Sequence, residues 1–177
     1  MIQLLTFVAC SAVLCTAVWI DFQTHRIPNK IILIGMSLAG FFSLLPVGIG
    51  LVDSALGWVV GLSIFLPLYL IGILGAGDVK LLAMVGMFVG YPAVFIVALY
   101  TCLAGGVLSI LIAIRFRKLH EMLNNLYQGI LILCLQISSR SRFTSIEMTT
   151  LQHRLPYALA ITVGTMAYVV LHTSIFY

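Results

Sequence analysis

The sequence predicts an all-α, polytopic membrane protein with about six transmembrane helices. Hydrophobic residues make up 62% of the 177 residues and charged residues only 8%, whereas soluble domains average about 45–50% apolar and about 25% charged residues. The apolar stretches are continuous rather than alternating, which excludes transmembrane strands. An ordinary soluble domain, a disordered chain and a nucleic-acid-binding module are therefore excluded, and the lipid bilayer is the first partner expected.

Six apolar stretches are expected to cross the bilayer and to form a single domain, residues 1–177. The fourth stretch is short, and Gly90-Tyr91-Pro92 marks the turn into the fifth. Residues 115–154 are expected on the cytoplasmic side, with an amphipathic surface helix over 121–137 followed by a loop. The expected spans are 1–20, 31–47, 53–74, 79–91, 93–114 and 155–175.

The basic residues predict how these spans are oriented. With six spans, all nine Lys and Arg residues fall on one side of the membrane, eight in the connections there and Lys80 at the start of the fourth span. By the positive-inside rule this side is cytoplasmic, so both chain ends are expected on the other side. The nine residues are Arg26, Lys30, Lys80, Arg115, Arg117, Lys118, Arg140, Arg142 and Arg154.

Two of the five acidic residues stand out because the alternation of spans puts them at the same membrane depth. Asp21 ends the first span and Asp78 precedes the fourth, both on the cytoplasmic side. Ionisable groups at a membrane are costly and are often functional. The other three, Asp53, Glu121 and Glu147, are expected to be solvated surface charges.

The residues around the two aspartates predict defined turns. Asp78 ends the segment Gly75-Ala76-Gly77-Asp78, whose glycines tolerate positive φ and the close approach of another chain. After Asp21, Pro28 disfavours helix at the residue before it, and Asn29 is placed to cap the second span. Two carboxylates held close together share one proton near neutral pH, which is the arrangement that aspartic proteolysis needs.

Other interpretations of the acidic pair remain open on this pattern alone. Both aspartates could be ordinary interfacial residues, relay carboxylates of a proton-coupled transporter, or remnants in an inactive membrane scaffold. Transporters usually hold such groups near the bilayer midplane and often carry internal repeats. Here the acids are expected at the interface and no repeat is visible, which favours the protease.

The two motifs together resemble those of the type IV prepilin peptidases, which are polytopic aspartic proteases of the Gly-x-Gly-Asp class. A third stretch, Leu155-Pro156-Tyr157-Ala158, is similar to the start of the family's last helix. The two motifs are Asp21 with Ile27-Pro28-Asn29, and Gly75-x-Gly77-Asp78-x-Lys80.

The resemblance implies a peptidase that removes the short basic leader of a pilin precursor at the cytoplasmic face of the bacterial inner membrane. It makes Asp21 and Asp78 the catalytic pair, and it places the cut just before the hydrophobic helix of the precursor, usually after glycine. Gly75 and Gly77 would let the substrate backbone approach. Lys80 would help to hold the aspartates or the leader, or would only extend to the membrane surface. Pro28 and Asn29 would support the site.

One departure from the family pattern limits what the resemblance implies. Full-length bacterial members carry a cytosolic domain with paired C-x-x-C motifs between the first two spans, whereas here that connection is only residues 21–30 and has no cysteine. The chain is therefore similar to the compact form of tight-adherence (Flp) pilus systems. N-methylation of the product does not follow from this form, and neither zinc nor another cofactor is expected.

Overall fold

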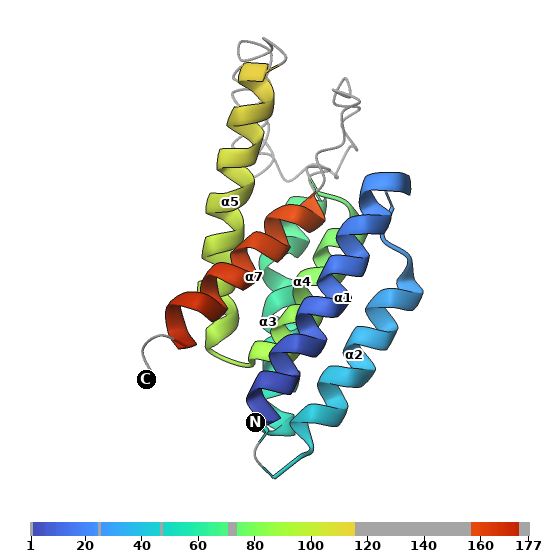
Figure 1. Ribbon diagram of the computed structural model, residues 1–177, viewed down its shortest axis with the longest axis vertical. Coiled ribbons are helices and arrows are strands. Elements are labelled where there is room, and N and C mark those ends of the chain that lie inside the picture. The colour runs from blue at the N-terminus through green and yellow to red at the C-terminus, as the bar shows by residue number, and fades with distance from the viewer. Residues whose placement is uncertain (1, 25, 47, 71–73, 116–156, 174–177) are drawn as a thin grey trace, which may run out of the picture.

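Every regular element in the described part of the chain is an α-helix. The computed structural model describes residues 2–24, 26–46, 48–70, 74–115 and 157–173, and its helices pack side by side in one bundle (Figure 1). They are α1 (Ile2–Thr24), α2 (Asn29–Ser43), α3 (Leu51–Leu70), α4 (Ala76–Val89), α5 (Ala93–Arg115) and α7 (Tyr157–Thr173).

The prediction of an all-α, polytopic membrane protein is confirmed. Three helical segments are long and apolar enough to cross a bilayer, and two shorter apolar helices lie beside them. The predicted amphipathic helix over 121–137 lies outside the described residues. The three long segments are Leu4–Thr24, Leu51–Leu70 and Ala93–Ile112, and the shorter ones are Asn29–Ser43 and Tyr157–His172.

Two predicted helix ends near Asp21 are wrong. Helix α1 continues through Asp21 to Thr24, whose hydroxyl oxygen lies 2.9 Å from the carbonyl oxygens of both Ile20 and Arg26 and shares its one hydrogen between them. Asp21 therefore lies inside a helix. At the start of α2, Pro28 takes the N-cap position with φ −65° and ψ 132°, so Asn29 is the first helical residue rather than the cap. The proline ring already favours that backbone conformation.

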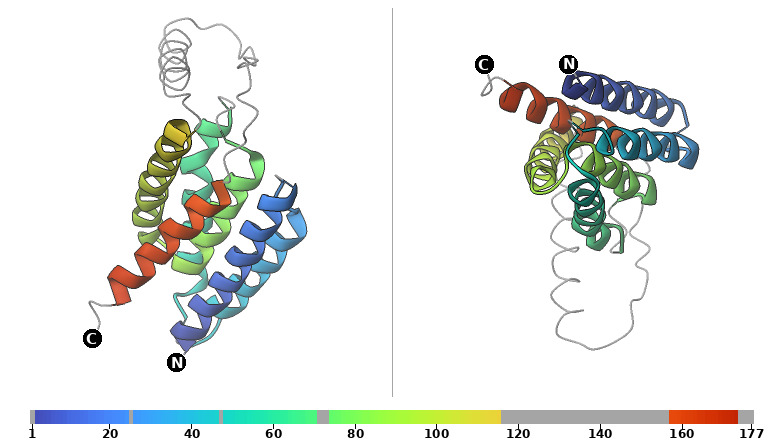
Figure 2. Two further views of the ribbon diagram at one scale, coloured as in Figure 1. Left: turned by 45° about the horizontal axis from the view of Figure 1, so that its top comes forward. Right: turned by 90° about the horizontal axis from the view of Figure 1, so that it is seen from below.

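Helix α4 is the centre of the bundle. It contacts all five other described helices, most extensively α3, and Figure 2 shows it among them. Its 14 residues span about 21 Å at 1.5 Å per residue, which is short of the roughly 30 Å hydrocarbon core. An apolar helix with no polar face needs such enclosure. Its buried residues are Val79, Leu81, Leu82, Ala83, Met84, Val85, Gly86 and Phe88.

Glycines allow α3 and α4 to approach until their backbones touch. A Cβ atom added to Gly57 would collide with the carbonyl group of Gly86, and one added to Gly86 would collide with that of Gly57. A Cβ atom on Gly61 would lie 2.9 Å from the carbonyl oxygen of Leu82. Small residues at helix interfaces are how membrane helices gain van der Waals contact without water to drive association. The two helices are thereby locked in register.

The helices alternate in direction, so residues far apart in the sequence meet at one end of the bundle (Figure 1). That end holds the last turn of α1, the first turns of α2 and α4, and the end of α5. Asp53 lies at the opposite end, where its carbonyl oxygen accepts a hydrogen bond from the Tyr91 N–H at 3.2 Å. The basic residues within the described ranges, Arg26, Lys30, Lys80 and Arg115, all lie at the first end.

Gly86→Val should destabilise the folded protein because its side chain would collide with the Gly57 carbonyl group. Overpacking of this kind typically costs about 1–3 kcal/mol. Gly106→Val is the matched control, because a Cβ atom at Gly106 in α5 would have no other atom within 4 Å. Thermal unfolding in detergent should show a lower midpoint for Gly86→Val only. Equal midpoints for the two variants would contradict the packing argument.

Candidate active site

Asp21 is carried into the bundle by the inner face of α1. Its side chain is 8% exposed, and the residues one and two turns before it on the same face, Ala17 and Leu14, are fully buried. Its neighbours Trp19 and Phe22 point outward and are 68% and 57% exposed. The 3.6-residue period of the helix thus separates a buried carboxylate from an exposed aromatic stripe.

Asp78 lies in the first turn of α4, where it caps its own helix. Its Oδ2 atom accepts a hydrogen bond of 3.2 Å from the Gly75 N–H, one of the N–H groups that a helix start leaves without an intrahelical partner. The expectation of positive φ is wrong here, because Gly75 has φ −79° and ψ 150°, an extended conformation open to any residue. Glycine at position 75 is favoured by the limited space beside it, since an added Cβ atom would lie 3.2 Å from Asp78 Oδ2.

The fold brings the two aspartates close enough to interact. Asp78 precedes the expected span 79–91, and its pKa is raised from 3.8 to about 6. Desolvation by burial is the main cause, and the negative charge of Asp21 adds to it. The hydrogen bond from Gly75 acts in the opposite direction. Desolvation and a like charge both disfavour a second ionised carboxylate, so this end of the bundle favours a pair that holds one proton.

The remaining residues of the two motifs hold the α1–α2 connection against α4. Lys80 Nζ donates a hydrogen bond of 3.1 Å to Asn29 Oδ1. A Cβ atom on Gly77 would lie 3.2 Å from the Cβ atom of Ile27. The space beside Gly77 is thus filled by this chain's own Ile27, and Lys80 is directed to Asn29. Pro28 precedes Asn29 as the N-cap residue of α2.

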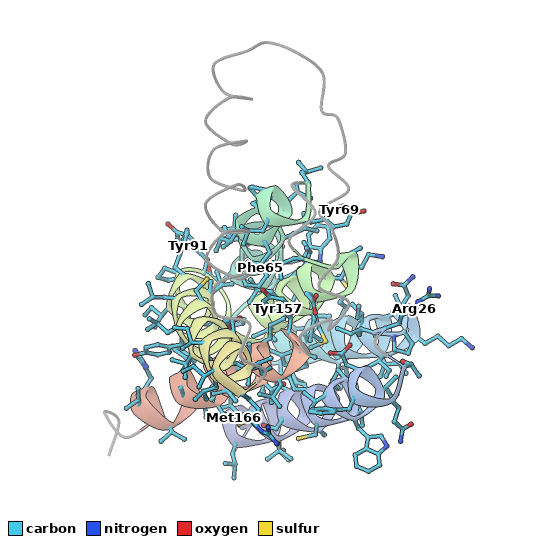
Figure 3. The ribbon with its side chains drawn as sticks, turned by 90° about the horizontal axis from the view of Figure 1, so that it is seen from above. Arg26, Phe65, Tyr69, Tyr91, Tyr157 and Met166 are labelled. Carbon is cyan, nitrogen blue, oxygen red and sulfur yellow. The ribbon has the colours of Figure 1, made fainter. Side chains whose placement is uncertain are left out.

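Tyr157, the first residue of α7, is a neighbour of the acidic pair that sequence reasoning did not single out as a site residue. It interacts electrostatically with Asp78 and is hydrogen-bonded to the side chain of Ser109 in α5. A Cβ atom on Gly105, one turn before Ser109, would lie 3.8 Å from the Cε1 atom of Tyr157. Figure 3 looks onto this end and shows Tyr157 near the middle of the helices, with Arg26 at the edge. The only sequence signal was its place in the Leu155-Pro156-Tyr157 stretch.

Nothing in the described ranges resembles a metal centre. No three His, Cys, Asp or Glu side chains gather there into a group that could hold a metal ion. His172 lies at the far end of α7, where its Nδ1 atom is 3.2 Å from the carbonyl oxygen of Tyr168. Near Asp78 the structure places the carboxyl group of Asp21 and the phenol of Tyr157.

These features define an all-helical membrane protein with an acidic pair at one end of its bundle. The sequence profile of the type IV leader peptidase family matches residues 8–110. This match spans more than half of the chain and includes both aspartates, so the chain belongs to this family of peptidases. No curated protein matches the chain, and neither does any solved structure.

Gly77→Val should lower peptidase activity, because the new side chain displaces Ile27 and shifts the α1–α2 connection beside the acidic pair. Displacements of about 1 Å near a reacting group can cost on the order of 10²-fold in rate. Adding Ile27→Ala to Gly77→Val removes the displaced side chain and should restore much of the activity. The assay compares the variants at equal protein levels with Gly106→Val as the control. Full activity of Gly77→Val, or no rescue by Ile27→Ala, would refute this role of the contact.

Proposed function

We propose that this protein is a prepilin leader peptidase that uses Asp21 and Asp78 as an aspartic dyad. Membership of the type IV leader peptidase family supports the peptidase activity. The observation that carries the dyad is the interaction between two carboxyl groups 57 positions apart in the sequence, each on a different helix. The proposed substrate is a pilin precursor with a short basic leader and an apolar helix. The proposed reaction takes place at the cytoplasmic face of the inner membrane, where the basic residues gather.

The proposed mechanism needs one proton shared by the pair. The ionised carboxylate removes a proton from a water molecule, and the water oxygen attacks the carbonyl carbon of the scissile peptide bond. The protonated carboxyl group then gives its proton to the amide nitrogen as the C–N bond breaks. General acid–base catalysis of this kind typically contributes about 10²–10⁴-fold. Burial of Asp78 beside Asp21 supports the required protonation state.

The compact form supports a precursor of the tight-adherence (Flp) type. Helix α1 ends at Thr24 and α2 begins at Asn29, so only residues 25–28 connect them. This connection is held onto α4 by Ile27 and Asn29 and leaves no room for a cytosolic domain with cysteine pairs. The proposed enzyme is therefore a single membrane domain that cleaves the leader without a requirement for N-methylation.

Asp21→Asn and Asp78→Asn should each abolish cleavage. Asn keeps the shape of the side chain but can neither accept the proton from water nor donate it as an acid, so the rate should fall about 10²-fold or more. The assay follows the size and the new N-terminus of a co-expressed precursor that has a basic leader ending in glycine. Asp53→Asn is the matched control, because Asp53 lies at the other end of the bundle, and it should cleave normally. Wild-type cleavage by either dyad variant would disprove the assignment.

Cleavage should fall as the pH rises through about 6, because Asp78 then loses the proton that the pair must share. It should fall again at low pH, when both carboxyl groups are protonated and neither can activate water. Initial rates in membranes give the profile, and Asp53→Asn should reproduce it. Thermal unfolding over the same pH range separates titration of the site from loss of folded protein. A rate that stays constant as the pH passes through about 6 would contradict the shared proton.

A further inference from the structure

An apolar groove runs between α1 and α7 on the outside of the bundle, at the end where Asp21 lies. Its volume is about 530 Å³, within the range of ligand-sized clefts. Thr162, one of its two non-cysteine polar residues, donates its hydroxyl to its own helix at the Ala158 carbonyl oxygen, 2.8 Å away. Gln23 is the other and marks the rim. The groove is lined by Cys15, Val18, Trp19, Phe22 and Gln23 of α1, and by Leu159, Thr162 and Val163 of α7.

The groove and the acidic pair share the same turns of α1. Trp19, Phe22 and Gln23 line the groove, while Asp21 between them faces inward. A chain that leaves the rim at Gln23 and crosses the end of α1 therefore reaches Asp21 within a few residues, since each extended residue spans about 3.3–3.6 Å.

The α2 side of the pair is occupied by this chain's own residues. On the α2 side, Ile27 packs on Gly77, and Lys80 is hydrogen-bonded to Asn29. These contacts hold the α1–α2 connection over the first turn of α4. An apolar segment that must begin next to Asp21 and Asp78 therefore meets the chain's own α1–α2 connection at α2 and an open groove at α1 and α7.

We propose that the α1–α7 groove binds the apolar helix of the precursor, directly after the peptide bond that is cut. This inference rests on the proposed function. The cut precedes an apolar helix in the same chain, so that helix must start within a few residues of the aspartates. Helices in a bilayer associate through close packing rather than through exclusion of water. A groove with an exposed Trp19 on one wall and Val163 on the other offers such packing to one further helix.

Photo-crosslinking tests where the substrate helix lies. A photoreactive phenylalanine analogue replaces Trp19 or Val163, and the probe is a peptide with a short Lys-rich leader, a glycine and an apolar helix of about 20 residues. Leu33 in α2 and Ile110 in α5 are the matched control positions. Leu33 is 67% exposed against 68% for Trp19, and Ile110 is 49% exposed against 48% for Val163. Crosslinks to the peptide helix are expected from positions 19 and 163 and not from the controls.

The outcomes separate this inference from the proposed function. Crosslinks to the peptide from position 33 or 110 alone would overturn the proposal that the groove binds the substrate helix. Crosslinks from positions 19 and 163 that form only with lipid or with a second copy of the chain would also overturn it. Each would do so even if Asp21→Asn and Asp78→Asn abolish cleavage. Crosslinks to the peptide from positions 19 and 163 would support the groove as its binding site even if Asp21→Asn and Asp78→Asn still cleave. In that case only the assignment of the aspartic dyad would be wrong.

A groove-filling substitution gives an independent kinetic test. Cys15 in the groove is an exposed, unpaired cysteine, and Leu111 on α5 is a 58% exposed side chain outside the groove. Cys15→Trp fills the groove and should raise KM for the peptide about tenfold with kcat unchanged, which is the signature of lost ground-state binding. Leu111→Trp adds bulk on α5, outside the groove, and should leave both constants unchanged. Equal KM values for the two variants would overturn the proposal.

Discussion

The contact on which this bundle depends is the backbone-to-backbone approach of α3 and α4 through Gly57, Gly61 and Gly86. It lets a helix of only 14 residues, with no polar side chain over residues 81–89, be enclosed by its neighbours. On the α2 side, Gly35 faces the Met84 side chain, which would collide with any Cβ atom there. Close packing replaces the hydrophobic effect as the force between helices in a bilayer. The depth at which α4 begins is therefore set by these glycines.

The start of α4 in turn sets the electrostatics of the acidic pair. A helix N-terminus and the Gly75 N–H both favour an ionised Asp78. Burial at the end of the bundle and the charge of Asp21 oppose them and prevail, since the pKa rises to about 6. Had α4 begun one turn earlier or later, its first carboxylate would no longer face Asp21. The raised pKa of Asp78 is thus a consequence of helix packing rather than of any single hydrogen bond.

Access to the pair is asymmetric for an equally physical reason. On one side Ile27 fills the space beside Gly77, and Lys80 is tied to Asn29. On the other, residues of α1 and α7 line an apolar groove at the end of the bundle where Asp21 lies. The residues of the two sequence motifs therefore have two different structural roles. Asp21 and Asp78 form the acidic pair, while Ile27, Asn29, Gly77 and Lys80 hold the neighbouring connection in place.

The sequence by itself determined the all-helical membrane class, because long runs of apolar residues leave no other fold in a bilayer. It also determined that Asp21 and Asp78 share one end, since alternating spans put every second connection on the same side. Only the tertiary structure decided that α1 continues to Thr24, that Gly75 needs space rather than positive φ, and that Tyr157 reaches Asp78. Composition and spacing report the period and length of single helices. The neighbours of each side chain depend on how closely separate helices pack, and that distance is set by contacts between residues far apart in the chain.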